Sequence, residues 1–458
     1  MEDIFIKMHW LRRLLLIIAV IGSWDVNSFA RNSEEHPAAT PPMGWNSWDS
    51  YGTTVREEQI KANADAMASA LAKYGWKYIV VDIQWYEPNA QGHEYKPGAR
   101  LSMDEYGRLV PAVNRFPSSA GGQGFKPLAD YIHNKGLKFG IHIMRGIPRQ
   151  AVEENLPIRG TRYHASDVAD LQSSCKWNSD MWGVDMTKPG AQAYYDSIAE
   201  LYASWGVDFI KADDMGSHQY QPAEIEALSS AIRKTVRPIV LSISPGPAPI
   251  SETQFFEKYA QMWRISDDFW DSWKLLRRQF DYARDWAPYV GKNETWPDAD
   301  MLPLGKLRVT STEGGGSPTK FTPDEQQTLI TLWCIFRSPL IFGGDLPSND
   351  ASTTALITNE EVLAVDQHSA NGHEQFADQN IRVWVADIPG SSDRYLAVFN
   401  IGDKPADLHL NWSRLAIPGT SARVRDLWRR TMLGTQKAVD AKLSPHASLL
   451  YRISDVRN

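Results

Sequence analysis

Phe209-Ile210-Lys211-Ala212-Asp213-Asp214 is the stretch that decides the fold of this 458-residue chain. The run over residues 207–210 is apolar and predicts a short buried strand, which gives way to a loop near Asp213. Neighbouring side chains of a strand point to opposite faces, so Lys211 and Asp213 share one face. A cation on that face keeps a carboxylate ionised, which a nucleophile requires. The stretch therefore predicts a reactive carboxylate at a strand end, with a structural ion pair as the alternative.

Short apolar runs of this kind alternate with helical segments over most of the chain. The expected strands are residues 43–49, 77–81, 137–143, 207–210, 238–244, 262–266, 296–302 and 339–343. Because each strand is followed by a helical segment, the pattern predicts a closed (β/α)8 TIM barrel, with a doubly wound open sheet as the alternative.

From about Phe376 the pattern changes to short alternating strands with turn residues between them and no long helix. This pattern is typical of an antiparallel β-sandwich. The expected domains are therefore a signal peptide over residues 1–30, a catalytic (β/α)8 barrel over 31–372 and a C-terminal β-sandwich domain over 373–458.

The first thirty residues are typical of a secretory leader. A basic start precedes an apolar run from Leu14 to Ile21, and Ser28-Phe29-Ala30 offers small residues for cleavage. The apolar run is short for a membrane span. We therefore expect a secreted or periplasmic chain, with an uncleaved anchor as the alternative.

The overall charge argues against two classes of partner. The formal net charge is −7, and no basic cluster follows the leader, so nucleic acid and anionic membranes are not expected to bind. The two cysteines, Cys175 and Cys334, do not have metal-ligand spacing, and no cluster of ligating residues stands out. We therefore expect neither a metal nor a cofactor.

Reactive side chains recur at the carboxyl ends of the expected strands, where barrels carry their active sites. The residues at these ends include Trp45, Asp82, Lys211, Asp213, Arg264, Asp268 and Asp300. Two carboxyl groups that face each other across a pocket can cleave a glycosidic bond, and for retention of configuration they lie about 5 Å apart. We assign Asp213 as the nucleophile and Asp268 as the acid/base.

The remaining side chains of this set are expected to bind a sugar. Trp45 offers a ring for its apolar face. The groups expected to hold its hydroxyls are Asp82, Arg264 and Asp300, with Lys211 beside them. His142, on the third strand, is interpreted as a satisfied wall residue rather than a ligand.

Several segments together resemble one known family, glycoside hydrolase family 27, the melibiase or α-galactosidase group. They include Pro41-Pro42-Met43-Gly44-Trp45-Asn46-Ser47-Trp48, Gly206 through Asp213, Arg264 through Asp268, Asp298 through Leu302 and Ser338 through Leu346. The resemblance covers nearly the whole chain after the leader. It implies the barrel, the C-terminal β-domain and a retaining exo-α-galactosidase that removes terminal galactosyl residues from a carbohydrate substrate. It also implies the same nucleophile and acid/base.

Two positions depart from the pattern of this family. The α-galactosidases usually carry two adjacent aspartates at the end of strand two, which hold the 4- and 6-hydroxyls, and here the pair is Asp82-Ile83. Strand five often carries a glutamate near the 2-hydroxyl, and here Ser244 takes that place among the substrate-binding residues. The alternatives are therefore an α-N-acetylgalactosaminide, a β-L-arabinopyranoside or an α-glucan end as substrate, or a non-catalytic carbohydrate-binding protein.

Overall fold

The computed structural model describes residues 37–217, 220–310 and 315–457, so the predicted leader lies outside the described part of the chain. Within these residues, no helix combines the length and apolar character that crossing a membrane requires.

Eight parallel strands form the central sheet, in the spatial order β10-β9-β8-β7-β3-β2-β1-β13. The strands are β1 (Met43–Asn46), β2 (Tyr78–Val81), β3 (Lys138–Met144), β7 (Phe209–Asp213), β8 (Val240–Ile243), β9 (Met262–Arg264), β10 (Trp296–Asp298) and β13 (Leu340–Phe342). The two end strands meet through Leu302, which follows β10 and forms a parallel bridge with Phe342. The sheet is therefore curled round on itself, as the barrel prediction requires.

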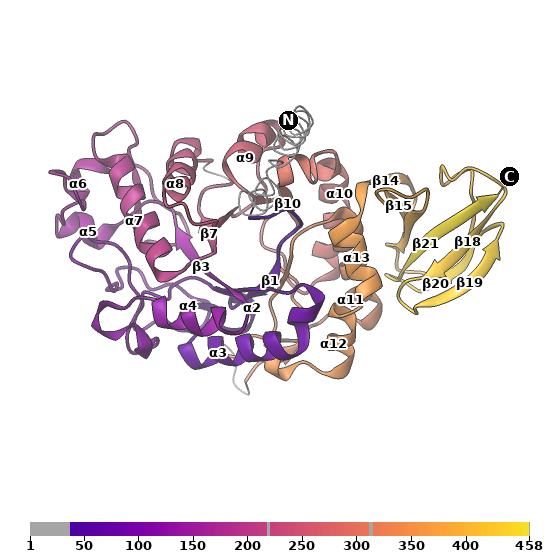
Figure 1. Ribbon diagram of the computed structural model, residues 1–458, viewed down its shortest axis with the longest axis horizontal. Coiled ribbons are helices and arrows are strands. Elements are labelled where there is room, and N and C mark those ends of the chain that lie inside the picture. Colours follow the sequence, from indigo (N-terminus) through magenta and orange to yellow (C-terminus); the bar gives the residue numbers. More distant parts are fainter. Residues whose placement is uncertain (1–36, 218–219, 311–314, 458) are drawn as a thin grey trace, which may run out of the picture. The chain divides into compact units, whose positions relative to one another are not determined.

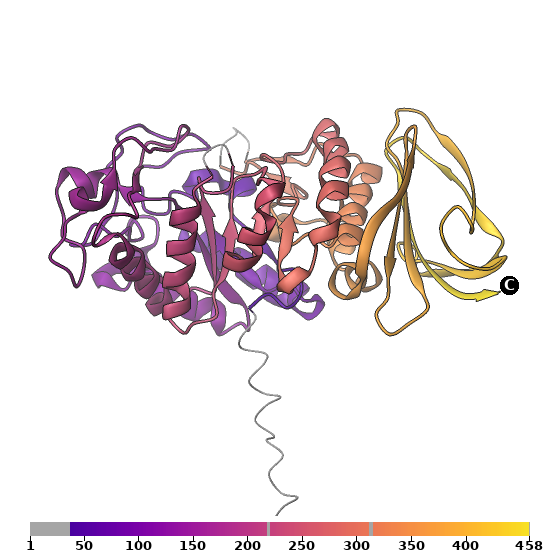
Figure 2. The ribbon, with the colours of Figure 1, turned by 90° about the horizontal axis from the view of Figure 1, so that it is seen from above.

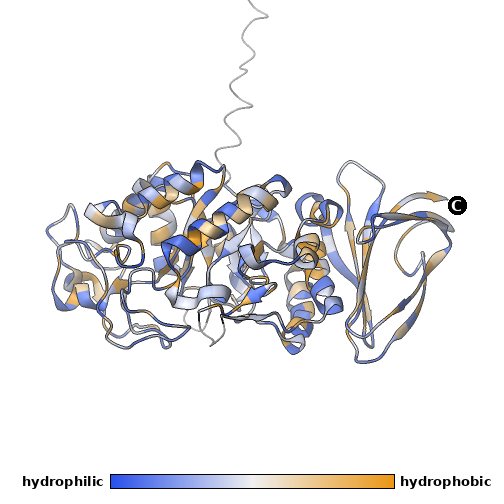
Figure 3. Ribbon diagram, turned by 90° about the horizontal axis from the view of Figure 1, so that it is seen from below, coloured by the Kyte–Doolittle hydropathy of each residue, from blue (hydrophilic) through white to orange (hydrophobic). Residues whose placement is uncertain are grey.

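A helix follows every strand of this sheet. The helices are α3 (Glu57–Ala66), α4 (Lys126–His133), α7 (Ala191–Trp205), α8 (Pro222–Lys234), α9 (Thr253–Tyr259), α10 (Trp273–Trp286), α11 (Pro323–Phe336), α12 (Ala351–Ile357) and α13 (Glu360–His368). Figure 1 shows them around the strands. The helices carry hydrophobic as well as hydrophilic residues (Figure 3), so they can pack on the sheet and face water. The predicted (β/α)8 architecture is confirmed.

Strand β7 shows how the sequence positions polar groups at one end of the barrel. Helix α7 ends at Gly206, whose φ of 86° suits glycine, and the chain turns at once into the strand. Phe209 packs in the barrel interior with Tyr78 and Val240. Because strand side chains alternate, Lys211 and Asp213 share the inward face of Phe209, nearer the carboxyl end of the strand.

The C-terminal domain is antiparallel. A six-stranded sheet has the order β14-β15-β16-β21-β18-β19, and β17 pairs with β20. The strands are β14 (Ala370–Asp378), β15 (Ile381–Asp387), β16 (Arg394–Asn400), β17 (Ala406–Asn411), β18 (Ser421–Asp426), β19 (Thr431–Gln436), β20 (Ala438–Leu443) and β21 (Ser448–Arg457). Apolar side chains of both sheets, such as Val398 and Leu410, form one core. Figure 2 shows these strands without a helix among them, which confirms the predicted domain type.

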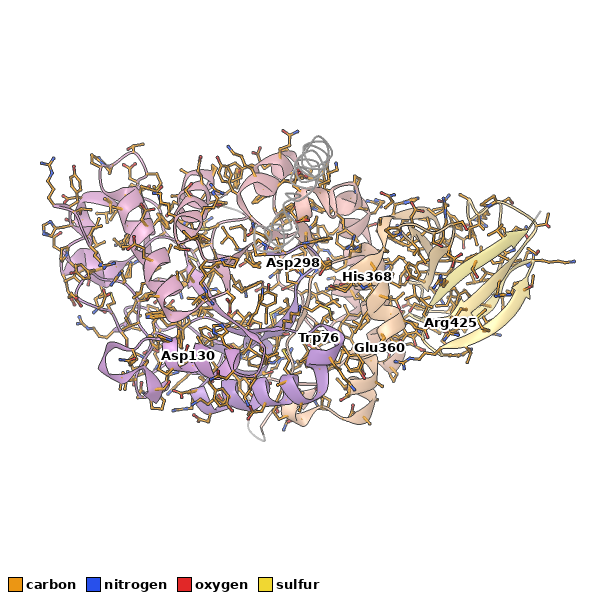
Figure 4. The ribbon with its side chains drawn as sticks, viewed as in Figure 1. Trp76, Asp130, Asp298, Glu360, His368 and Arg425 are labelled. Atoms are coloured by element: carbon orange, nitrogen blue, oxygen red, sulfur yellow. The ribbon has the colours of Figure 1, made fainter. Side chains whose placement is uncertain are left out.

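Helix α11 connects this domain to the barrel. Gln327 Nε2 donates to the carbonyl of Ser448 at 2.8 Å, and Trp428 Nε1 donates to Thr331 Oγ1 at 2.9 Å. On α13, Glu361 pairs with Arg425, which Figure 4 labels beside Glu360, at 2.6 Å. The C-terminal domain is thus attached by partly buried polar contacts.

Candidate active site

A pocket of about 430 Å³ opens at the carboxyl ends of the barrel strands. Figure 4 labels Asp298, the last residue of β10, inside the ring of helices. The residues that line the pocket are Trp48, Asp49, Asp82, Ile83, Tyr95, Trp177, Lys211, Asp213, Pro245, Arg264, Asp267, Asp268, Phe269, Trp270, Asp300 and Met301. The structure therefore brings together six predicted site residues, from β2, β7, β9 and β10: Asp82, Lys211, Asp213, Arg264, Asp268 and Asp300.

Both carboxylate oxygens of Asp213 are held by donors. Oδ2 lies 3.1 Å from His142 Nε2, and Oδ1 accepts the backbone N–H of Asp214 at 3.0 Å. Burial works to raise the pKa of Asp213. The hydrogen bond and charge of His142, followed by the charge of Lys211, outweigh burial and leave this pKa below its ordinary value. Asp213 is therefore ionised, as a nucleophile must be.

The partner of Lys211 differs from the prediction. Lys211 Nζ lies 3.0 Å from Asp82 Oδ2. Lys211 lowers the pKa of Asp213, as predicted, but the hydrogen bond and charge of His142, which the sequence did not predict, contribute more. His142 is a buried residue of the barrel wall, as interpreted, but it is not fully satisfied, since its Nδ1 is buried without a partner among the described residues.

Asp82 is fixed by three donors. Its Oδ2 accepts Asn46 Nδ2 at 2.7 Å and Lys211 Nζ, and its Oδ1 accepts the N–H of Ile83 at 2.8 Å. Burial alone would raise the pKa of Asp82, but the charges of Lys211 and His142 and these hydrogen bonds lower it to about 2. Asp82 is a permanent anion that can accept a sugar hydroxyl.

Arg264 contacts two further carboxylates of the site. Its guanidinium lies 2.6 Å from Asp300 Oδ2 and 3.3 Å from Asp268 Oδ1. The side chain of Asp268 is 67% exposed, whereas that of Arg264 is 4% exposed. Asp268 therefore stands at the open side of the pocket.

Two predicted substrate-binding residues do not line the pocket. Trp45 is fully buried, and its Nε1 donates to the carbonyl of Gly344 at 2.7 Å. Strand alternation explains this placement, because Asn46 faces Asp82 in the barrel and its neighbour Trp45 must face the helices. Trp48, two residues past β1, lines the pocket instead.

Ser244 is the other predicted substrate-binding residue that does not line the pocket. It is buried, with its Oγ 3.5 Å from the carbonyl of Ala212, and the next residue, Pro245, forms the pocket wall. The backbone turn after β8 thus brings Pro245, rather than Ser244, to the pocket wall.

The sequence reasoning missed Asp49 and the aromatic side chains around the opening. Trp48 and Tyr95 stack at a centroid distance of 6.2 Å, and Tyr95 lies 5.3 Å from Trp177. Asp49 directly follows Trp48, at the end of the first expected strand. Tyr95 and Trp177 lie in long loops, where no periodicity marks a residue as part of a site.

Comparisons with known proteins find matches for both domains of this chain. A family described as alpha galactosidase A matches residues 40–188 and 182–368, and its C-terminal beta sandwich domain matches 378–453. An α-galactosidase from Coffea arabica is 31% identical, over 90% of this chain and 93% of its own length. α-Galactosidase 2 from Arabidopsis thaliana is 29% identical, over 91% of this chain and 90% of its own length.

A solved structure is more similar in sequence. A β-L-arabinopyranosidase of glycoside hydrolase family 27 from Geobacillus stearothermophilus is 52% identical, with a TM-score of 0.89, and the match covers 92% of this chain and 97% of that one. With both domains matched and the strand-end carboxylates gathered in one pocket, the chain belongs to glycoside hydrolase family 27, the melibiase or α-galactosidase family, and is a glycoside hydrolase.

Proposed function

We propose that this chain is a retaining exo-glycosidase that removes terminal α-D-galactosyl residues, with Asp213 as the nucleophile and Asp268 as the acid/base. The observation that carries the proposal is the pairing of two unlike carboxyl groups in one pocket. Asp213 is only 14% exposed and is held as an anion, whereas Asp268 is 67% exposed and stands at the open side. A retaining mechanism needs such a division of roles.

The reaction proceeds in two displacements. Asp213 attacks the anomeric carbon as the glycosidic bond breaks, and Asp268 gives its proton to the departing oxygen. The ionised Asp268 then takes a proton from a water molecule, which attacks the same carbon and releases Asp213. Asp82, fixed by Lys211, is placed to accept a hydroxyl of the bound sugar.

A second substrate, a β-L-arabinopyranoside, is favoured by one residue. This sugar has the ring of an α-D-galactopyranoside without the exocyclic hydroxymethyl group. Ile83 lines the pocket at the position where α-galactosidases carry the second aspartate, and it is only 2% exposed. An apolar side chain cannot hold a 6-hydroxyl, and a hydroxyl left unpaired beside it costs about 1–3 kcal/mol. The similar Geobacillus protein is a β-L-arabinopyranosidase.

The α-N-acetylgalactosaminide alternative has less support. It depended on space beside the small side chain of Ser244, and the pocket wall there is Pro245.

The test compares kcat/KM for 4-nitrophenyl α-D-galactopyranoside and β-L-arabinopyranoside in the wild type and Ile83→Asp. We expect turnover of both and a shift of the ratio toward the galactoside by about tenfold or more in the variant, since a hydrogen bond of a charged group is gained. Ile83→Val, which keeps the wall apolar, is the control. A wild type that hydrolyses neither glycoside would refute the proposed function.

We also propose that the chain is exported through residues 1–30, because these residues match a leader in charge and apolar length. Expression of the full chain followed by N-terminal sequencing of the extracellular or periplasmic protein tests this. A chain that stays inside the cell with an intact N-terminus would contradict it.

A further inference from the structure

We propose that His142 is a positioning residue for the nucleophile: its Nε2–H donates a hydrogen bond to Asp213 and stabilises this carboxylate as it departs from the glycosyl-enzyme. The inference rests on the proposed double displacement at Asp213.

The two side chains come from neighbouring strands. In the register of β3 and β7, His142 lies opposite Lys211 and Met144 lies opposite Asp213. The side chain of His142 is 0% exposed, and its Nε2 lies 3.1 Å from Asp213 Oδ2. The backbone of His142 is held as well, because its carbonyl accepts Trp85 Nε1 at 2.8 Å.

The chemistry of the pair decides the direction of the hydrogen bond. An ionised carboxylate only accepts hydrogen bonds, so the hydrogen lies on Nε2 whether the ring is neutral or charged. The other nitrogen, Nδ1, is buried and has no partner among the described residues. Leaving a buried polar atom unpaired costs free energy. The contact through Nε2 is therefore the feature that distinguishes this ring from an apolar side chain of similar size.

No other side chain of the described site takes over this contact. Lys211 Nζ is paired with Asp82 at 3.0 Å, and the N–H of Asp214 serves the other oxygen of Asp213. Without His142, Asp213 Oδ2 loses its side-chain donor in the structure described here.

The strength of this hydrogen bond changes during the reaction. A hydrogen bond to an ionised acceptor is about twice as strong as one to a neutral acceptor. Asp213 is charged in the free enzyme and neutral once it is esterified to the sugar. The bond weakens as the ester forms and strengthens as Asp213 departs. His142 therefore favours the second displacement more than the first.

The test measures the two displacements separately in His142→Phe. With a 2,4-dinitrophenyl glycoside of the preferred sugar, the leaving group departs readily and deglycosylation limits kcat. We expect kcat to fall by about tenfold or more and KM to fall with it, so that kcat/KM changes little. A burst of dinitrophenol should equal the enzyme concentration, and intact-mass spectrometry should show one glycosyl adduct.

The matched control is His142→Gln, whose side-chain amide places an N–H near the position of Nε2 and should restore kcat. His142→Asn is one methylene shorter and cannot reach Asp213, so it repeats the test if the phenylalanine variant does not fold. A folded variant without the donor that keeps the wild-type kcat, or that loses kcat/KM as much as kcat without a burst, would overturn the inference. Turnover by the wild type and its loss in Asp213→Gly report on the proposed function independently of these comparisons.

Discussion

The carboxyl group of Asp298 lies in surroundings that favour its neutral form. Burial raises its pKa to about 7 in spite of the nearby Arg264. An unfolded aspartate has a pKa of about 4, so the folded state binds this proton more tightly. The stability that this group contributes is fully present below about pH 4 and is lost as the pH rises through about 7.

The pH dependence can be isolated with Asp298→Asn, which keeps the oxygen that accepts the N–H of Asp300 at 2.9 Å. We expect the Tm of the wild type to fall relative to that of the variant between about pH 5 and about pH 8. Thermal unfolding of both proteins across this range measures the difference. A difference that stays constant with pH would contradict the titration of Asp298 in this range.

The role of Asp268 makes a second prediction for a single residue. Without a proton donor, a poor leaving group departs slowly, whereas dinitrophenolate needs little assistance. We expect Asp268→Ala to lower kcat/KM for a phenyl glycoside by about 10²–10⁴-fold and for a dinitrophenyl glycoside far less. Asp267→Ala, the adjacent exposed carboxylate of the same pocket, is the control. Equal losses on both substrates would show that Asp268 is not the acid.

At this scale the sequence predicts residue types better than their contacts. Six pocket residues were predicted correctly from their positions at the ends of the expected strands, because the parallel strands of a barrel end on one face. The prediction that Trp45, rather than Trp48, lines the pocket was wrong. Both residues lie in the same quoted segment, and only the exact end of β1 at Asn46 distinguishes them. The contact of His142 with Asp213 depends on the register of β3 and β7, which apolar periodicity does not define.

At the scale of elements, the long connection between β3 and α7 shapes the opening of the pocket. It contains β4 (Ile147–Pro148), β5 (Ala169–Asp170) and β6 (Met181–Val184), which form a small antiparallel sheet. Trp177, just before β6, lines the pocket and is 40% exposed. An exposed aromatic ring at the opening can stack on the group attached to the terminal sugar.

Trp177→Ala should therefore weaken binding of large aglycones. We expect KM for a glycoside with an aromatic or sugar aglycone to rise by about tenfold, since such stacking contributes about 0.5–1.5 kcal/mol beyond the buried area. A methyl glycoside should be nearly unaffected. Leu171→Ala, an exposed residue of the same connection that does not line the pocket, is the control. An equal change in KM for methyl and aryl glycosides would contradict a role for Trp177 in aglycone binding.

Two of the strands that the sequence did not predict, β14 and β19, share a physical reason. Strands β14 and β19 are the two edges of the six-stranded sheet, and every residue of β19 is at least partly exposed. Edge strands need no alternating apolar face, so periodicity gives no signal for them. The barrel strands, buried between the interior and the helices, read as apolar runs and were predicted.

At the scale of the whole described chain, the barrel and the C-terminal domain share apolar contacts. Phe280 of α10 and Phe399 of β16 are fully buried, with ring centroids 4.9 Å apart. Because each ring fills space between the two domains, we expect the two domains to unfold together. Phe399→Ala should lower the free energy of unfolding by about 3–5 kcal/mol.

Calorimetry and loss of enzyme activity on heating measure this coupling. We expect one transition in the wild type, and a lower, still single transition in Phe399→Ala, with activity lost at the same temperature. Met432→Ala, an exposed residue of β19, is the control and should leave Tm unchanged. Two separate transitions in the wild type would contradict coupled unfolding.

The central claim is that the carboxylate of Asp213 attacks the sugar, and Asp213→Gly tests it most directly. We expect this variant to lose turnover of an activated aryl glycoside. Added azide should occupy the vacated space and restore release of the aryl group, giving a glycosyl azide of inverted configuration that nuclear magnetic resonance identifies. A variant that keeps its activity without azide would contradict the assignment of the nucleophile.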